Sequence, residues 1–300
     1  MSTINKSFKL SLVILVNICS SVTYSQIPKE EVSSFFTMKT MIYKTTGSTE
    51  LKVYIYQPVG LKDNERRPAI IFFFGGGFSG GKVTQFVPQC KYLVERGLVA
   101  MVADYRVKSR HNVTPFECVA DARSAISWLR IHADELGIDR NRIVASGGSA
   151  GGNIAVCTAL IKDLDENNEG LSVSSVPDAL VLFNPPLNMV ESIKNPETLF
   201  KDKSARVQEI SPYHHISAGA RPTIIFHGTK DSSVPFRQAV SFCNEMKQYG
   251  NRCELVPFEG REHGFFNWYS GDNPDFFATM EYTVKFLISI GYLKEDTIKE

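Results

Sequence analysis

The 300-residue sequence has almost no net charge, and this lack excludes several classes of protein. Its 33 lysines and arginines nearly balance 32 aspartates and glutamates, which leaves a formal net charge of +1. Binding to nucleic acid or another polyanion needs a clustered basic excess, so we expect no nucleic-acid partner. The sequence also has no internal repeat, low-complexity tract or long run of one charge, and its composition is that of an ordinary globular chain.

Closely spaced metal ligands are missing as well. The cysteines beyond residue 25 are Cys90, Cys118, Cys157, Cys243 and Cys253. None of them forms the short pairs that zinc sites use, so we expect neither a metal nor an organic cofactor. An odd number leaves at least one thiol unpaired. Two candidate disulfides remain open: Cys243 with Cys253, between which the chain reverses, and Cys90 with Cys118.

An apolar run at the N-terminus is preceded by positive charge. Lys6 and Lys9 come before residues 10–19, and small or polar residues follow. The run is too short to span a bilayer, so it predicts a secretory signal peptide over residues 1–25. The mature part, 26–300, is then one secreted or periplasmic catalytic domain without stable membrane insertion. An uncleaved anchor is the alternative.

Apolar runs alternate with helix-compatible segments along most of the chain. This alternation predicts an α/β fold with a mostly parallel central sheet and helices on both faces. Two runs near the N-terminus, 37–44 and 50–57, alternate apolar and polar residues and predict an antiparallel hairpin. Residues 184–221 interrupt the rhythm between two core strands and predict a small cap insertion. The buried strands are expected at 69–74, 98–103, 142–146, 179–183, 223–226 and 253–258.

The central motif is Gly147-Gly148-Ser149-Ala150-Gly151, which fits the pattern Gly-x-Ser-x-Gly. An apolar run precedes it and a helix-compatible run follows it. A serine on a sharp strand-to-helix turn has a strained backbone, and small residues two positions away let strand and helix approach. The sequence therefore predicts that Ser149 is a nucleophile. A glycine-rich turn of no catalytic significance is the alternative.

A serine nucleophile needs a base, and the chain supplies one downstream. Asp231 follows the strand expected at 223–226, and His263 lies in the loop past the strand expected at 253–258. The carboxyl ends of parallel strands share one edge of a sheet, so both side chains are expected near Ser149. His263 would accept the serine proton, and Asp231 would orient the imidazole.

Three glycines, Gly75 to Gly77, end the strand expected at 69–74 and leave backbone N–H groups open to an oxyanion. Together with Ser149, Asp231 and His263, this loop makes the chain resemble the α/β-hydrolase superfamily. The similarity runs from about Val53 to Leu287 and is greatest to secreted esterases of the hormone-sensitive-lipase-like, feruloyl and acetylxylan types.

The resemblance implies that the N–H groups of Gly76, Gly77 and Ala150 form the oxyanion hole. The sequence departs from the family in one position, because Phe74 stands where a histidine usually precedes the glycines. Backbone donors do not need that imidazole, so activity is expected to survive. The hydrogen bonds that fix the loop must differ.

Aromatic residues near these motifs are candidates for substrate contacts. Phe78 follows the glycine loop, and Phe265 and Trp268 follow His263. Phe78 could narrow the acyl side of the site. In the aromatic group after His263, packing in the core is the alternative, although one or two residues could line a sugar-binding cleft.

These features predict a secreted serine carboxylesterase that removes short acyl groups, with an acylated carbohydrate as the expected substrate. A small-molecule ester is the other substrate class. The first rival function is a serine peptidase of the prolyl-oligopeptidase type, which shares the fold and the triad but usually carries an N-terminal propeller. The second is a non-catalytic binding protein on the same fold. The sequence does not predict an oligomeric state.

Overall fold

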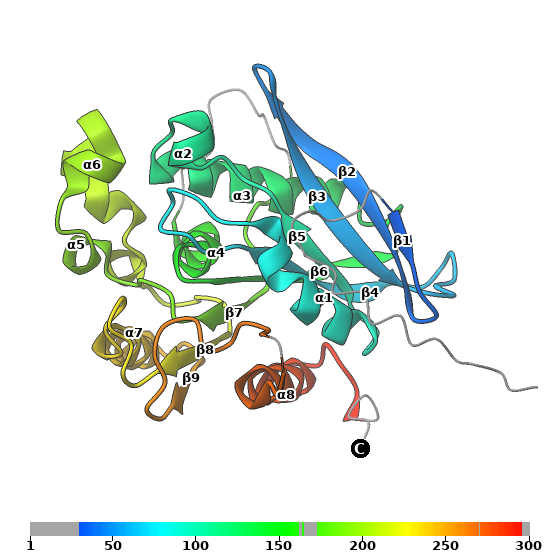
Figure 1. The fold of residues 1–300 in the computed structure, drawn as a ribbon. Coiled ribbons are helices and arrows are strands. Elements are labelled where there is room, and N and C mark those ends of the chain that lie inside the picture. The colour runs from blue at the N-terminus through cyan, green and yellow to red at the C-terminus, as the bar shows by residue number, and fades with distance from the viewer. Residues whose placement is uncertain (1–29, 162–163, 165–172, 270, 296–300) are drawn as a thin grey trace, which may run out of the picture.

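A computed structural model describes residues 30–161, 164, 173–269 and 271–295 (Figure 1). The predicted signal peptide lies outside the described residues. Within the described ranges, no helix is both long enough and apolar enough to cross a membrane.

A nine-stranded sheet forms the centre of the molecule, with the strand order β1-β2-β3-β5-β4-β6-β7-β8-β9. The first three strands pair in antiparallel fashion, β3 pairs antiparallel with β5, and all the later pairs are parallel. The strands are β1 (Glu30–Val32), β2 (Phe36–Thr46), β3 (Thr49–Pro58), β4 (Arg67–Phe73), β5 (Val99–Ala103), β6 (Ile138–Gly148), β7 (Ala179–Phe183), β8 (Thr223–Gly228) and β9 (Cys253–Phe258).

Helices and short 3₁₀ turns connect these strands. The α-helices are α1 (Val87–Val94), α2 (Lys108–His111), α3 (Pro115–Ile131), α4 (Ala150–Leu160), α5 (Met189–Ser192), α6 (Pro196–Phe200), α7 (Arg237–Gln248) and α8 (Pro274–Ser289). The 3₁₀ turns are η1 (Val83–Phe86), η2 (Lys201–Ile210) and η3 (Pro212–His215).

The central strands are apolar on both faces because helices cover both faces. In β4, Ile70 and Phe72 point into a core built with α1 and α8. The alternate residues of the same strand, Ile71 and Phe73, point into a second core built with α3, α4 and α7. Figure 1 shows α1 and α8 on one side of the sheet and α3 and α4 on the other.

The strand order explains where a site can form. From β4 the chain moves to β5 on one side and then to β6 on the other side, so the sheet has a topological switch point at β4. Ligand sites of open α/β sheets lie outside the carboxyl ends of the strands at such a point. The glycine loop follows β4 and the Ser149 turn follows β6, so both reach this crevice.

The predicted α/β-hydrolase architecture is confirmed. The strands at 179–183 and 253–258 begin and end where the sequence places them, and the hairpin of β2 and β3 is present. The sequence does not predict β1, a three-residue strand. Such a short segment carries no readable alternation.

The segment 184–221 between β7 and β8 consists of short helical pieces: α5, α6, η2 and η3. The longest, η2, spans ten residues and buries only Val207 and Ile210. This is the region in which the sequence predicts a small cap.

One disulfide joins Cys243 of α7 to Cys253, the first residue of β9. The alternative pair does not form, because Cys90 and Cys118 are free and buried, as is Cys157. Burial raises the pKa of the Cys157 thiol and keeps it in the protonated form. Helix α7 packs against β9, so the disulfide fastens the outermost strand of the sheet to its helix.

We predict that breaking this disulfide destabilises the protein by roughly 2–3 kcal/mol, because it closes a short loop in the unfolded chain. Urea unfolding with and without dithiothreitol measures the difference. The double variant Cys243→Ser/Cys253→Ser is the control, since its stability should match that of the reduced protein and not respond to reductant. Wild-type stability that is indifferent to reductant would contradict the prediction.

Candidate active site

Ser149 sits on a strained turn between β6 and α4. Its backbone has φ 54° and ψ −126°, outside the regions that non-glycine residues ordinarily occupy. The Ser149 N–H donates to the carbonyl oxygen of Phe183 at 2.9 Å, and the Asn153 N–H donates to the carbonyl oxygen of Ser149 at 3.0 Å. The end of β7 and the first turn of α4 therefore hold the strained residue in place.

Two glycines make this turn possible. A Cβ atom on Gly147 would lie 2.6 Å from the carbonyl oxygen of Phe73, and one on Gly151 would overlap the same oxygen. Helix α4 therefore approaches β4 and β6 more closely than any side chain at these two positions would allow. This close approach explains why the Gly-x-Ser-x-Gly motif has glycine at both positions.

The structure brings Ser149, His263 and Asp231 together in one hydrogen-bonded line. Ser149 Oγ lies 2.9 Å from His263 Nε2, and His263 Nδ1 lies 2.7 Å from Asp231 Oδ2. A carboxylate only accepts hydrogen bonds, so Nδ1 carries the proton and Nε2 is left to accept the serine proton. The Asp231 side chain is fully buried, whereas 25% of the His263 side chain is exposed. The line thus runs from the protein interior to the cavity.

Asp231 is held as a carboxylate. Burial alone would raise the pKa of this carboxyl. Hydrogen bonds from His227, His263 and the Val234 amide, together with the charge of His263, outweigh burial and hold the pKa well below its usual range. Oδ1 accepts the N–H groups of Ser233 at 2.9 Å and Val234 at 2.8 Å.

His227 is a second, fully buried histidine beside this carboxylate. Its Nε2 lies 2.9 Å from the Val234 carbonyl oxygen and 3.4 Å from Asp231 Oδ2. Since both partners accept, Nε2 carries the proton. These contacts make His227 a buried hydrogen-bonding residue that supports the Asp231 carboxylate.

The glycine loop presents its N–H groups to the same place. Gly76 and Gly77 have φ values of 133° and 60°, which glycine adopts without strain. The Gly76 carbonyl oxygen is turned into the loop, where it accepts the N–H groups of Ser79 and Gly80, each at 3.1 Å. Within the described residues, no hydrogen bond uses the N–H of Gly76, Gly77 or Ala150. These donors are available to a ligand.

Phe74 replaces the expected histidine without loosening the loop. Its ring stacks on Tyr105 at 4.1 Å between centroids, and the Tyr105 hydroxyl donates to the Phe74 carbonyl oxygen at 2.7 Å. Burial raises the pKa of Tyr105 well above its ordinary value, so the hydroxyl stays a donor. From the opposite side, Gln85 Oε1 accepts the N–H of Gly75 at 2.7 Å.

A cavity of about 340 Å³ lies over the serine. The sequence reasoning missed four polar residues that line it, Gln85, Asn184, Ser233 and Asn267, together with Gly264. Phe266, which belongs to the aromatic group after His263, also lines it. None of the four polar residues belongs to a recognisable motif. Only Asn184 carried a signal, since it is a polar residue directly after the predicted strand 179–183.

Asn184 has the most unusual environment of these residues. It is fully buried, has φ 36°, and places Nδ2 3.3 Å from His263 Nε2. Its Oδ1 has no hydrogen-bond partner among the described residues. A strained backbone and an unpaired buried oxygen both cost stability, and here both occur beside His263.

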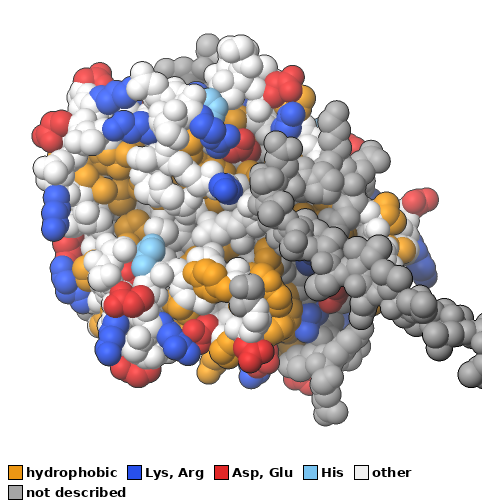
Figure 2. Space-filling view, in the orientation of Figure 1, with side chains coloured by type: hydrophobic (Ala, Val, Ile, Leu, Met, Phe, Trp, Pro, Cys, Tyr) orange, Lys and Arg blue, Asp and Glu red, His pale blue; other side chains and the backbone are white. Residues whose placement is uncertain are grey.

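None of the three aromatic candidates lines this cavity. Phe78 is buried under the glycine loop, and Phe265 packs on Phe258 with ring centroids 4.5 Å apart. Trp268 is 45% exposed and lines a separate groove of about 260 Å³, with Tyr92 and Phe277 among its neighbours. Figure 2 shows hydrophobic side chains gathered on this face of the molecule.

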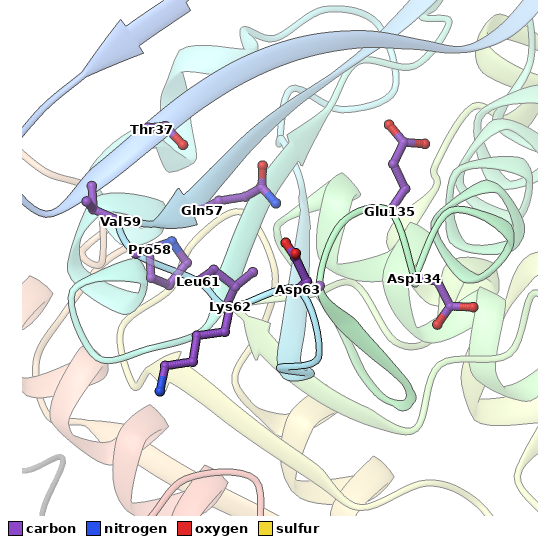
Figure 3. Close-up of a pocket in the computed structure, with 11 residues that line it drawn as sticks. Thr37, Gln57, Pro58, Val59, Leu61, Lys62, Asp63, Asp134 and Glu135 are labelled. Carbon is purple, nitrogen blue, oxygen red and sulfur yellow. The ribbon is translucent and has the colours of Figure 1, made fainter.

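A larger cavity, of about 510 Å³, lies at the opposite edge of the sheet (Figure 3). It borders residues that precede β4 and β6, whereas Ser149 follows β6. Its Asp134 pairs with Arg66 and Arg140, and its Gln57 donates to the Leu136 carbonyl oxygen at 3.0 Å. Asp134 and Gln57 are thus engaged in structural contacts, and none of Ser149, Asp231 and His263 lines this cavity. The smaller cavity, which Ser149 and His263 line, is therefore the candidate active site.

No group of three or more His, Cys, Asp or Glu side chains in the described ranges is arranged to hold a metal ion. The chemistry considered below uses side chains and backbone amides alone.

Known proteins resemble this chain in sequence and in structure. It is 30% identical to a probable isoprenylcysteine α-carbonyl methylesterase of Arabidopsis thaliana over 217 residues. This alignment covers 66% of this chain and 45% of that protein. It is also 30% identical to a probable carboxylic ester hydrolase of Mycobacterium tuberculosis over 202 residues. This alignment covers 60% of this chain and 45% of that protein. The chain thus spans about half the length of these relatives.

The structural similarity is more extensive. The apo form of Thermogutta terrifontis esterase 2 has a TM-score of 0.81 and 51% sequence identity, over 85% of this chain and 96% of that one. These relatives support a serine hydrolase that acts on carboxylic esters. The model of the family described as BD-FAE matches residues 53–246, which include the glycine loop, Ser149 and Asp231. Because this match covers more than half of the chain, the protein belongs to the BD-FAE family of α/β hydrolases.

Proposed function

We propose that this protein is an exported serine carboxylesterase that removes short acyl groups from acylated carbohydrates. The observation that carries the catalytic part is the unbroken line from Ser149 through His263 to buried Asp231, beside three unused backbone N–H groups. In this proposal Ser149, His263 and Asp231 are the catalytic residues, and the N–H groups of Gly76, Gly77 and Ala150 bind the oxyanion.

The reaction follows from the geometry. Ser149 Oγ attacks the ester carbonyl carbon while His263 Nε2 takes its proton. The carbonyl oxygen becomes an oxyanion on the three N–H groups, each of which is worth about 3 kcal/mol in comparable sites. His263 then gives the proton to the departing alcohol, which leaves an acyl group on Ser149. A water molecule, deprotonated by His263, attacks the acyl carbon and releases the acid and the free serine.

The size of the cavity and a related structure support a short acyl group. The cavity over Ser149 has a volume of about 340 Å³ and is lined by four polar side chains besides those of Ser149 and His263. Thermogutta terrifontis esterase 2, 50% identical over 86% of this chain with a TM-score of 0.80, has been solved with butyrate bound. The polar 184–221 segment offers no broad apolar surface of the kind that a lipase exposes to lipid.

The aromatic groove supports a carbohydrate as the alcohol. Trp268 and Phe277 are each 45% exposed, and Lys91 and Glu95 stand at the same groove. The apolar face of a sugar ring stacks on such aromatic rings, and its hydroxyls bond to charged side chains. One short segment borders both the cavity and the groove, because Asn267 lines the cavity and the next residue, Trp268, lines the groove.

Export is part of the same proposal. The predicted signal peptide over residues 1–25 would deliver the mature chain outside the cytoplasm. The Cys243–Cys253 disulfide supports this, because disulfides persist in oxidising compartments.

We predict that Ser149→Ala lowers kcat/KM for ester hydrolysis by roughly 10⁴-fold or more, because the nucleophile is lost. Thermal unfolding should not move to a lower temperature, since alanine keeps the Cβ atom and removes only the hydroxyl. Paraoxon is the control reagent: mass spectrometry should find one diethylphosphoryl group on Ser149 in the wild type and none in the variant. Activity above a tenth of wild type in Ser149→Ala would place the nucleophile elsewhere.

We predict that the rate rises between about pH 6 and 7 and then levels off, because an imidazole base must be neutral to accept the serine proton. The Asp231 carboxyl does not titrate between pH 6 and 7 and so adds no change in rate there. The pKa of Asp231 lies below its ordinary value, so its stabilising bonds are present above about pH 4 and are lost only at lower pH.

In the same series, Asp231→Asn should reduce kcat by roughly 10⁴-fold while changing KM little, as in comparable triads. Rates of p-nitrophenyl acetate hydrolysis from pH 4 to 9 measure both effects. A wild-type rate that is flat from pH 5 to 8 would argue against a histidine base.

We predict that kcat/KM for p-nitrophenyl esters falls beyond butyrate. A tunnel that buried each further methylene would gain about 0.8 kcal/mol, and the polar cavity offers no such surface. Release of acetate from acetylated xylan or an algal glycan tests the carbohydrate. Trp268→Ala should raise KM for the glycan and leave p-nitrophenyl acetate unaffected. A rise in kcat/KM toward decanoate would indicate a lipase instead.

A further inference from the structure

We propose that Gln85 and Asn267 are positioning residues that hold the oxyanion loop in register with the catalytic histidine. Gln85 Oε1 accepts the Gly75 N–H at 2.7 Å, and Gln85 Nε2 donates to Asn267 Oδ1 at 2.9 Å. Asn267 Nδ2 donates to the carbonyl oxygen of Gly264, next to His263, at 2.9 Å. Three hydrogen bonds therefore connect the loop after β4 to the loop after β9.

The backbone groups at the two ends of these three hydrogen bonds, the Gly75 N–H and the Gly264 carbonyl oxygen, fix the orientation of both side-chain amides. An N–H at Gly75 requires an acceptor, so the oxygen of Gln85 faces it and the nitrogen faces Asn267. The oxygen of Asn267 must then face Gln85, which turns its nitrogen to the Gly264 carbonyl oxygen. Reversing either amide would bring two donors or two acceptors together. The pair is thus a directional link with a single satisfied arrangement.

The link lies where small displacements matter. A Cβ atom on Gly75 would stand 3.3 Å from Ser149 Cβ and 2.9 Å from the Gly148 carbonyl oxygen, so this residue lies directly against the nucleophile turn. Gly76 and Gly77, the next two residues, carry the proposed oxyanion donors. A misplacement of about 1 Å in such a site can cost about 100-fold in rate.

The glycine loop has two side-chain anchors. Tyr105 holds the carbonyl oxygen of Phe74 and belongs to the segment after β5. Gln85 holds the adjacent N–H and, through Asn267, reaches the histidine loop. Only the second anchor connects the oxyanion donors to the general base. Phe74 stands where the family usually has a histidine, and these two anchors hold the loop without an imidazole.

A neighbouring contact provides a matched control. Gln89 lies one helical turn after Gln85, and its Nε2 donates to the Phe266 carbonyl oxygen at 3.2 Å. This bond also ties the region of α1 to the histidine loop, but it does not touch Gly75. If the histidine loop only needed anchoring, substitution of Gln85 and of Gln89 would lower kcat equally. If the link positions the oxyanion loop relative to the histidine, only substitution of Gln85 or Asn267 lowers kcat.

The experiment is a double-variant cycle with Gln85→Leu and Asn267→Leu on hydrolysis of p-nitrophenyl acetate. We expect each single variant to lose roughly 10- to 100-fold in kcat with KM within about 3-fold, since donors are misplaced and not removed. The loss of kcat in the double variant should not exceed that of the more impaired single variant, because both substitutions break the same hydrogen-bonded link. Gln89→Leu should stay within about 3-fold of wild type.

Inhibition by a trifluoromethyl ketone separates positioning from a general structural role. Ser149 adds to this ketone, and the oxyanion of the hemiketal needs the same donors as the transition state. We expect the inhibition constant to rise in Gln85→Leu and Asn267→Leu by the factor by which kcat falls. Gln85→Ala and Asn267→Ala repeat the cycle if a leucine variant unfolds.

Additive losses in the double variant, or an equal loss in Gln89→Leu, would overturn the proposal. The inference rests on the proposed catalytic roles, and Ser149→Ala in the same assay tells the two apart. Full activity in Ser149→Ala would refute the proposed function. A dead Ser149→Ala together with fully active Gln85→Leu and Asn267→Leu would refute only the register.

Discussion

The close approach of helix α4 to strands β4 and β6 is the constraint on which the site depends. No side chain fits at Gly147 or Gly151 against the Phe73 carbonyl oxygen, and this contact forces Ser149 to φ 54°. The same contact sets the Ala150 N–H beside the serine and brings the end of β4 against the turn. The general base and its carboxylate come from β8 and β9, farther out on the same edge of the sheet. Strands near the centre of the sheet thus position the proposed nucleophile, and its outer strands position the proposed base and the carboxylate that orients it.

A buried ionic cluster supports the oxyanion side of the site. Asp121, on α3, is fully buried and accepts the Arg106 backbone N–H at 3.0 Å and its guanidinium at 2.8 and 2.7 Å. Lys44 of β2 lies 3.1 Å from the same carboxylate. These contacts fix the residue next to Tyr105, whose hydroxyl holds the base of the glycine loop. Removing one member of such a buried group leaves the others uncompensated, so its effect on the free energy of unfolding exceeds that of a surface pair.

The sequence predicted the fold because its central strands are long apolar runs with glycine-rich ends. It predicted where Ser149, Asp231 and His263 would lie because one topological rule brings the ends of parallel strands together. It did not predict Gln85, Asn184 or Asn267, since their places depend on the path of loops and on which way an amide turns. Trp268 shows the same limit: its neighbourhood was readable from the sequence, but its placement in a separate groove depends on how the loop after His263 packs against α1 and α8.

The position of β9 at the end of the sheet gives the site an uneven local stability. Ser149 follows β6, which has a hydrogen-bonded strand on each side, whereas His263 follows β9, which is paired only with β8. Outer strands open more readily than central ones, with opening free energies below that of global unfolding. The disulfide to α7 opposes this opening by tethering the first residue of β9. The proposed general base therefore follows an edge strand of the sheet, and the covalent tether protects His263 more than it protects Ser149.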